Sequence, residues 1–234
     1  MHWSKSVNGM RRLFWVLVAV GIAASVPLAV PAQTAPTNRF VVVLDAAHGG
    51  DDPGARLTSG QMEKTVTLAL SVRLRSLLAA RGMQVVTTRE SDSTVDPNRR
   101  AEIANHANAQ VCLSLHATES GLGAHLYASS IAPAQSTRFT AWKTAQSAWV
   151  TSSLRLSGVL NSSLTNAGIS VILGRTALPV IESMTCPAVA VEIAPERDSD
   201  NAITAEPDDV AYQARVASAL AAALVQWRTE ARQP

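Results

Sequence analysis

Strand-like and helix-like segments alternate along this chain, and no other feature of the sequence restricts its fold as strongly. Residues 40–45 (FVVVLD) form an unbroken apolar, β-branched run of strand length, the pattern of a central strand that is covered on both faces. After a glycine-rich loop, apolar residues recur every three or four positions over residues 63–81, which predicts an amphipathic helix that ends at Gly82. The first unit is therefore a strand followed by a helix.

Further units of the same kind follow along the chain. Strands are predicted at residues 83–89, 110–117, 123–130, 169–174 and 188–193, and helices at residues 97–109, within 135–165 and at 210–227. This alternation implies βαβ units, which place helices on both faces of a mostly parallel sheet. We predict a single α/β domain, a three-layer αβα fold with a mostly parallel sheet of about six strands.

The amino end differs from the rest of the chain. Three basic residues precede residues 13–30, a run of 18 residues with no charged side chain, which is typical of a secretory signal peptide. We predict a signal peptide at residues 1–32, a short linker at 33–38 and an exported domain at 39–234 with no further stretch long enough to span a membrane. The alternative is an uncleaved leader that anchors the protein, because its apolar run is close to the length of a membrane span.

Charge and cysteine content narrow the partners and the chemistry. Without the leader the chain has 17 basic and 18 acidic residues, a net charge of −1, which disfavours a nucleic-acid binder. Disulfides can persist in an exported protein. Cys112 falls inside an apolar run and free cysteine is commonly buried, so we favour two buried thiols, with a bridge between Cys112 and Cys186 as the alternative.

Polar residues with metal-binding or catalytic chemistry stand where the predicted strands end. In open α/β sheets, ligands bind outside the carboxyl ends of the strands. The residues at three strand ends and at the start of the first helix are His48, Glu63, His116 and Glu192. Two histidines with two carboxylates suit a catalytic zinc ion, which takes three protein ligands, leaves one position for water and needs a further carboxylate to carry protons.

Taken singly, each of these residues has a simpler explanation. A histidine after a strand is often only a loop residue, and Glu63 suits the first turn of a helix, where a negative charge complements the helix dipole. A carboxylate at Glu192 would be costly if buried without a partner, so it is harder to explain by structure alone. We leave His106 outside the site as a solvent-facing helix residue, and His125 as a partly buried loop histidine.

Other enzyme classes find little support in the sequence. The loop at residues 48–55 (HGGDDPGA) has neither the G-x-G-x-x-G order nor a Walker A ending, which disfavours a nucleotide site. No G-x-S-x-G motif for a serine hydrolase is present. Cys112 lies within a strand and Cys186 precedes Pro187, and neither has an evident partner histidine for nucleophilic catalysis.

Five segments together carry a family resemblance. They are VVVLDAAHGGDDPGA, MEKTVTLALSVRLRSLLAARG, VVTTRESD, NRRAEIANHANAQVCLSLHA and CPAVAVEIAP. In order and spacing they resemble the zinc-dependent N-acetylmuramoyl-L-alanine amidases of the family called amidase type 3, over residues 39–227. The resemblance implies that residues 39–234 are a zinc amidase catalytic domain. It also implies one zinc ion per chain, held by His48, Glu63 and His116, and a catalytic base at Glu192.

The resemblance further implies an activity and a location. Such a protein would hydrolyse the amide between N-acetylmuramic acid and the L-alanine of the stem peptide, with peptidoglycan or muropeptides as substrate, in the periplasm or at the cell wall. An activator protein is a possible partner, because some relatives carry a helix that covers the zinc until an activator removes it. Residues 135–165 are the segment that could hold such a helix in this chain.

Two residues are expected to support the site, and two rival functions remain. Asp45 is expected to orient the His48 imidazole or the loop, with capping of the loop amides as the alternative, and Arg175 is a candidate contact for a substrate carboxylate. One rival is a non-catalytic module that binds or regulates the cell wall on the same scaffold. The other is a related zinc peptidase acting on a different amide bond, since the same four groups serve any amide.

Overall fold

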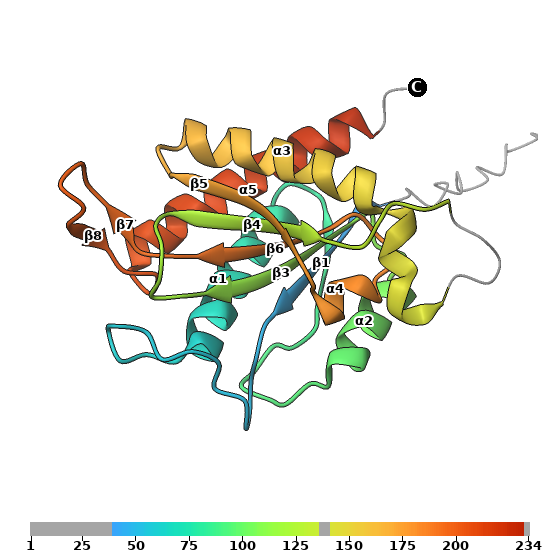
Figure 1. Cartoon of the computed structure of the whole chain (residues 1–234), viewed down its shortest axis with the longest axis horizontal. Coiled ribbons are helices and arrows are strands. Elements are labelled where there is room, and N and C mark those ends of the chain that lie inside the picture. The colour runs from blue at the N-terminus through green and yellow to red at the C-terminus, as the bar shows by residue number, and fades with distance from the viewer. Residues whose placement is uncertain (1–38, 136–140, 232–234) are drawn as a thin grey trace, which may run out of the picture. The chain divides into compact units, whose positions relative to one another are not determined.

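The central element is a six-stranded sheet with the strand order β2-β1-β3-β6-β4-β5 (Figure 1). The structure, a computed structural model, describes residues 39–135 and 141–231, so the predicted leader and linker lie outside the described residues. The strands of this sheet are β1 (Val41–Ala46), β2 (Gln84–Thr87), β3 (Val111–Ala117), β4 (Ala124–Ser129), β5 (Val171–Thr176) and β6 (Ala188–Ile193). Two further short strands, β7 (Glu196–Arg197) and β8 (Ile203–Ala205), pair with each other.

Helices cover both faces of the sheet, which confirms the predicted three-layer α/β fold (Figure 1). The helices are α1 (Glu63–Ala79), α2 (Pro97–His106), a 3₁₀ helix η1 (Trp142–Ala148), α3 (Val150–Asn166), α4 (Pro179–Glu182) and α5 (Val210–Glu230). Helices α1 and α3 lie on one face with α5 packed against both, while α2 and α4 lie on the other face. Among the described helices, none is long and apolar enough to cross a membrane.

The sequence pattern explains these elements. Alternate residues of β1 enter opposite cores, Val42 and Leu44 toward α1, and Val43 toward α2, which is why this strand is apolar throughout. Helix α1 buries the apolar stripe that its spacing predicts. Helix α2 begins at Pro97, and the Asp96 carboxylate caps it by accepting a hydrogen bond from the amide of Asn98.

The structure shows the direction of β4, which the sequence does not predict. Strands β1, β2, β3 and β6 are parallel, but β4 runs antiparallel to β6, and β5 is parallel to β4. The start of β4 therefore lies at the same edge of the sheet as the ends of β3 and β6. The sequence pattern gives a mostly parallel sheet but does not report the direction of β4.

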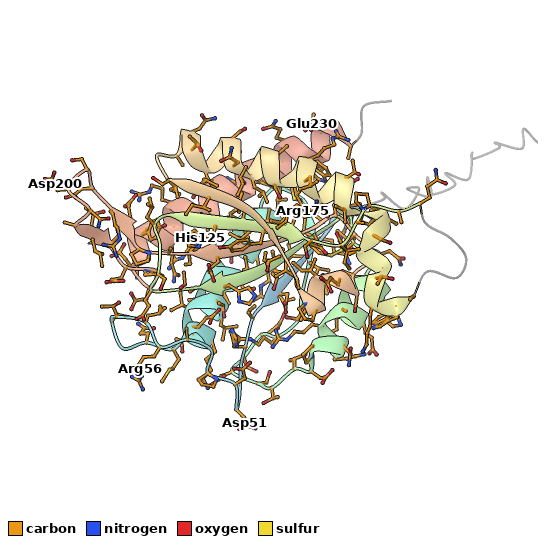
Figure 2. All side chains as sticks on the ribbon, in the orientation of Figure 1. Asp51, Arg56, His125, Arg175, Asp200 and Glu230 are labelled. Carbon is orange, nitrogen blue, oxygen red and sulfur yellow. A yellow bond between two sulfur atoms is a disulfide. The ribbon has the colours of Figure 1, made fainter. Side chains whose placement is uncertain are left out.

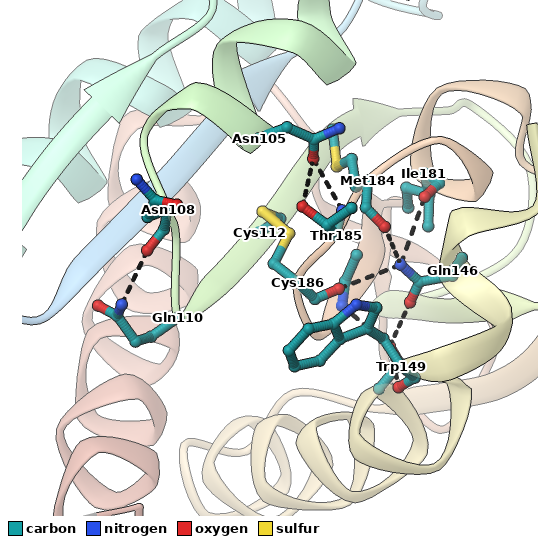
Figure 3. Close-up of a disulfide and its surroundings, with 12 residues drawn as sticks. Asn105, Asn108, Gln110, Cys112, Gln146, Trp149, Ile181, Met184, Thr185 and Cys186 are labelled. Atoms are coloured by element: carbon teal, nitrogen blue, oxygen red, sulfur yellow. Dashed lines mark hydrogen bonds between the residues drawn. A yellow bond between two sulfur atoms is a disulfide. The ribbon is translucent and has the colours of Figure 1, made fainter. Parts of the chain in front are cut away.

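The two cysteines form a disulfide, so the expectation of two buried thiols is wrong (Figure 3). Cys112 is the second residue of β3 and Cys186 precedes β6, and the two strands are neighbours, with Cys112 opposite Ala188. This pairing brings the cysteine Cα atoms to 6.2 Å, within the range that a disulfide spans. The sequence alone does not show that the third and sixth strands are adjacent.

The sequence did not predict α4. The segment that contains it, residues 178–186, forms hydrogen bonds with η1 and with α2 (Figure 3). The Gln146 side-chain amide donates hydrogen bonds to the carbonyls of Met184 and Cys186, at 3.0 and 3.1 Å. Asn105 on α2 accepts hydrogen bonds from the amide and the hydroxyl of Thr185. Within the described part of residues 135–165, η1 packs on α4 and α3 lies on the opposite face of the sheet, away from α2.

Removing the disulfide should lower the stability of the domain. The bridge closes a loop between residues 74 positions apart, and a loop of this size loses much conformational entropy in the unfolded chain when it is crosslinked. We expect the double variant C112A/C186A to lose about 2–4 kcal/mol of unfolding free energy, measured by denaturant unfolding. Unchanged stability in the variant, together with no effect of reducing agent on the wild type, would show that the bridge does not form in solution.

Candidate metal centre

Two buried arginines shape the turn that follows β1. Arg89 donates hydrogen bonds to the carbonyls of Ala46 and Ala47, at 2.8 and 3.0 Å. Arg100 donates to the carbonyls of Ala46 and His48, each at 2.7 Å. His48 itself has a φ of 61°, in the left-handed region that non-glycine residues seldom adopt. The arginines thus hold the backbone in a conformation that turns the His48 side chain toward the edge of the sheet.

Asp45, predicted to orient His48 or its loop, is buried and acts on the loop through Arg100. Its carboxylate accepts hydrogen bonds from Arg100, Thr88 and Ser114, at 2.7, 2.7 and 2.8 Å. The carboxylate lies in a buried ion pair with Arg100, and no amide of the loop donates to it among the described residues. Asp45 therefore fixes the guanidinium, and the guanidinium fixes the carbonyl of His48.

His48, Glu63 and His116 come together from three elements at the edge of the sheet. Glu63 is the first residue of α1, and its Oε2 lies 3.0 Å from Nε2 of His48. Its Oε1 lies 2.9 Å from Nδ1 of His116 near the end of β3. The backbone amides of Ala55 and Ala117 also donate to the Glu63 carboxylate, so both of its oxygens have a fixed direction.

These three side chains have the composition and spacing of a metal site. Each offers one ligand atom, and the three atoms lie within 4.8 Å of one another, close enough to share one ion. Two nitrogen ligands and one carboxylate oxygen form a set that zinc accepts with a fourth position left open. On the far side of the His48 ring, Nδ1 donates to Asp52 at 2.8 Å, the kind of outer carboxylate contact that orients a metal-binding histidine.

The electrostatics keep the carboxylate ionised. Burial raises the pKa of Glu63, but hydrogen bonds from His116 and His48 outweigh it and hold the pKa well below the usual carboxyl range. The bond to Glu63 raises the pKa of His48 against the opposing effect of burial. The bond to His48 in turn lowers the pKa of Asp52. Glu63 is therefore available as an anionic ligand throughout the neutral pH range.

Glu192 lies in the same cross-strand row as His116, and His125 completes this row. In the sheet, Glu192 of β6 is opposite His116 of β3 on one side and opposite His125 of β4 on the other. Residues directly opposite each other on neighbouring strands project to the same face. Nδ1 of His125 lies 2.7 Å from Oε2 of Glu192. His125, which we left outside the site, thus contacts the predicted catalytic base, while His106 is exposed on α2.

Arg175 is not part of this group. It pairs with Ala128 toward the end of β4 and β5, at the edge of the sheet opposite the start of β4. Figure 2 shows Arg175 and His125 toward opposite ends of these two outer strands. The Arg175 guanidinium donates to the carbonyls of Ser129 and Ile131. Its predicted contact with a substrate carboxylate therefore gains no support from its position.

A cavity of about 430 Å³ adjoins the candidate metal centre. Its walls include His48 and His116, residues 95–97 before α2, and residues 178–181 around α4. The exposed surface of the cavity is mostly apolar, which suits an uncharged group. The polar side chains that line it are those of the two histidines, the Asp45–Arg100 pair, Asp52, Thr94, Asp96 and Ser114. The segment fastened by the disulfide and by Gln146 thus forms one wall of the cavity.

The fold and the site together define an α/β protein with a histidine–glutamate–histidine group that could hold a metal ion at the carboxyl edge of its sheet. The model of the amidase type 3 family, described as N-acetylmuramoyl-L-alanine amidase, matches residues 42–226, so the chain belongs to this family. This confirms the family that the sequence motifs resemble.

Individual relatives agree with this membership. The N-acetylmuramoyl-L-alanine amidase AmiA of Escherichia coli is 40% identical over 80 residues, which are 34% of this chain and 28% of AmiA. The sporulation-specific N-acetylmuramoyl-L-alanine amidase of Bacillus subtilis is 38% identical over 82 residues, 34% of this chain and 32% of that protein. The aligned parts thus span about a third or less of these two curated relatives.

Solved structures share the fold over most of the described chain. The catalytic domain of CwlV, an amidase from Bacillus (Paenibacillus) polymyxa, superposes with a TM-score of 0.63 and 25% identity, covering 81% of this chain and 98% of that one. The CwlD amidase of Clostridioides difficile, solved in complex with the GerS lipoprotein, has a TM-score of 0.62 and 20% identity over 82% of this chain and 99% of its own. The latter comparison shows the fold alone.

The Arg100 contacts should account for a large part of the domain's stability. Replacing Arg100 with methionine leaves the Asp45 carboxylate buried without its ion-pair partner, which we expect to cost about 3–5 kcal/mol in denaturant unfolding. Arg99→Met, at the preceding residue of the same helix, removes an exposed guanidinium and should change stability by less than about 1 kcal/mol. Equal losses in the two variants would contradict the role given to Arg100.

Gly54 should be essential to the packing of the metal centre. A Cβ atom there would come within 2.7 Å of both Oε2 of Glu63 and Cδ2 of His48. We expect Gly54→Ala to weaken Zn²⁺ binding by at least about tenfold in calorimetric titration. Gly60→Ala is the matched control, because Gly60 also has a positive φ but nothing lies within 4 Å of its would-be Cβ. If both variants bind zinc like the wild type, the ligand placement described above is wrong.

Proposed function

We propose that this protein is a zinc-dependent N-acetylmuramoyl-L-alanine amidase, which cleaves the amide between N-acetylmuramic acid and the L-alanine of the stem peptide. The observation that carries the proposal is that His48, Glu63 and His116 form one group able to hold a metal ion. Glu192 lies beside it on β6, the strand paired with the β3 strand of His116. Membership of the amidase type 3 family supports the choice of bond. A metal centre alone would fit any amide.

The ligand assignment follows from the donor atoms. We infer that Nε2 of His48, the Glu63 carboxylate and Nδ1 of His116 hold one zinc ion per chain, because these atoms already face one another. Zinc bound there would supply an activated water and polarise the scissile carbonyl. Asp52 keeps the His48 ring oriented by accepting the hydrogen from Nδ1. The amide of Ala117 orients one oxygen of Glu63 by donating a hydrogen bond to it.

Glu192 is assigned the proton transfers. Its side chain is 28% exposed, so it can reach water while lying in the same row as His116. As general base, Glu192 removes a proton from the attacking water, and as general acid it returns that proton to the departing amine of L-alanine. The proton thus moves from water to the amine without a second acid, and the products are the muramyl carboxylate and a free amino terminus.

The substrate and the cellular setting follow from the same assignment. We propose peptidoglycan or soluble muropeptides as substrate, with the apolar cavity beside the centre taking an uncharged portion of it. Export to the periplasm or cell wall is proposed from residues 1–32, with anchoring through an uncleaved leader as the alternative. An activator protein is a candidate partner, since the related fold of CwlD is found in complex with a lipoprotein.

Two rival functions are separated by a digestion experiment. A non-catalytic wall-binding module would bind murein without releasing peptide, and a zinc peptidase would cleave other amide bonds. The amidase reading is favoured because the chain keeps all three ligand-type residues together with Glu192. The experiment is digestion of purified murein, with the products analysed by mass spectrometry and the zinc content measured on the same sample.

We expect the wild type to release stem peptides with free L-alanine amino termini and to contain about one zinc ion per chain. Glu192→Gln should lower kcat by on the order of 10²- to 10⁴-fold while retaining zinc, because the amide cannot accept the proton. Glu230→Gln, at the end of α5 on the opposite face of the sheet, is the control and should leave kcat unchanged. Zinc-loaded wild type that cuts other peptide bonds, or binds murein without cutting it, would contradict the proposal.

A further inference from the structure

His125 contacts the proposed catalytic base in a setting unlike that of a surface histidine. Its side chain is 7% exposed, and Nδ1 lies 2.7 Å from Oε2 of Glu192. The two residues are directly opposite each other in the antiparallel β4–β6 pair. Since His116 is opposite Glu192 on the other side, Glu192 stands between a metal-ligand residue and His125 in a single row.

The surroundings of the ring select one hydrogen-bonding state. Nε2 of His125 is buried and has no hydrogen-bond partner among the described residues. A hydrogen on Nε2 would therefore be buried without an acceptor, which is costly, whereas a hydrogen on Nδ1 can be donated to the Glu192 carboxylate. The neutral ring with its hydrogen on Nδ1 satisfies this arrangement.

The ring is also held in place by its neighbours. A Cβ at Gly121 would lie only 2.5 Å from Cε1 and Nε2 of His125, so the glycine backbone closes directly over this end of the ring. Tyr127 packs edge-on against it, with ring centroids 6.1 Å apart. A ring enclosed on these sides cannot easily rotate away from Glu192, so the Nδ1–H bond has a fixed direction.

We propose that His125 is a positioning residue for Glu192, an inference that rests on the proposed amidase function. Its Nδ1–H holds Oε2 of Glu192 on the side away from His116 and leaves Oε1 to face the metal side. Oε2 accepts the hydrogen bond from His125, and Oε1 has no hydrogen-bond partner among the described residues, which suits an atom that must receive a proton. During the reaction Oε1 takes the proton from water and passes it to the amine, while His125 keeps its own hydrogen on Nδ1.

The test compares three substitutions of His125 that differ in where they place a donor. Asparagine puts its side-chain NH₂ near the position of Nδ1, glutamine reaches toward the position of Nε2, and leucine has no donor. We expect His125→Asn to keep kcat within about threefold of the wild type. We expect His125→Gln and His125→Leu to lower kcat by about 10- to 100-fold with KM nearly unchanged, because the base is misdirected while substrate binding is retained.

Two further measurements separate this role from a structural one. Zinc content and denaturant unfolding are recorded for every variant, and ¹⁵N NMR of the full chain reports whether the His125 hydrogen lies on Nδ1 in the wild type and whether its signal shifts in Glu192→Gln. Equal losses of kcat in all three variants, or a hydrogen on Nε2, would overturn the positioning role alone. A folded, zinc-loaded wild type without amidase activity would instead overturn the proposed function, and this inference with it.

Discussion

The site depends on the buried guanidinium groups of Arg89 and Arg100, which donate hydrogen bonds to backbone carbonyls at the end of β1. Arg89 and Arg100 together donate to the carbonyls of residues 46–48, where β1 ends and the loop that carries His48 begins. Burial lowers the pKa of Arg89, and the nearby positive charge of Arg100 lowers it further, so these two cations oppose each other. The Asp45 carboxylate and the carbonyl oxygens offset that repulsion. The strained left-handed backbone of His48 is stable because these hydrogen bonds hold it in place.

Much of this site could be predicted from the sequence because parallel strands end at one edge. The positions of His48, Glu63 and His116 at strand ends and at a helix start predict that they lie close together, and the structure places their potential ligand atoms within 4.8 Å of one another. The same argument does not find His125, which lies near the start of its strand. In an antiparallel strand the start lies at the edge where parallel strands end, and the direction of β4 is not encoded in local periodicity.

The disulfide was missed for a related reason. Cys112 reads as a buried apolar residue, which it is, and only the adjacency of β3 and β6 makes Cys186 its partner. The arginines were equally hard to foresee, because a buried arginine looks in sequence like any charged helix or loop residue. A local pattern reports which residues are buried and which end a strand. Which non-local groups they meet depends on strand order and direction.

The disulfide and the row of His116, Glu192 and His125 lie at two ends of the β3–β6 strand pair. Cys112 is opposite Ala188, two residues after Cys186, and four residues further along both strands His116 is opposite Glu192. Side chains alternate between faces, so a slip of one residue in β6 would turn Glu192 toward the layer of α1, α3 and α5, away from the metal-ligand group. The bridge at the start of the pair opposes such a slip. It therefore secures the register that sets Glu192 between His116 and His125.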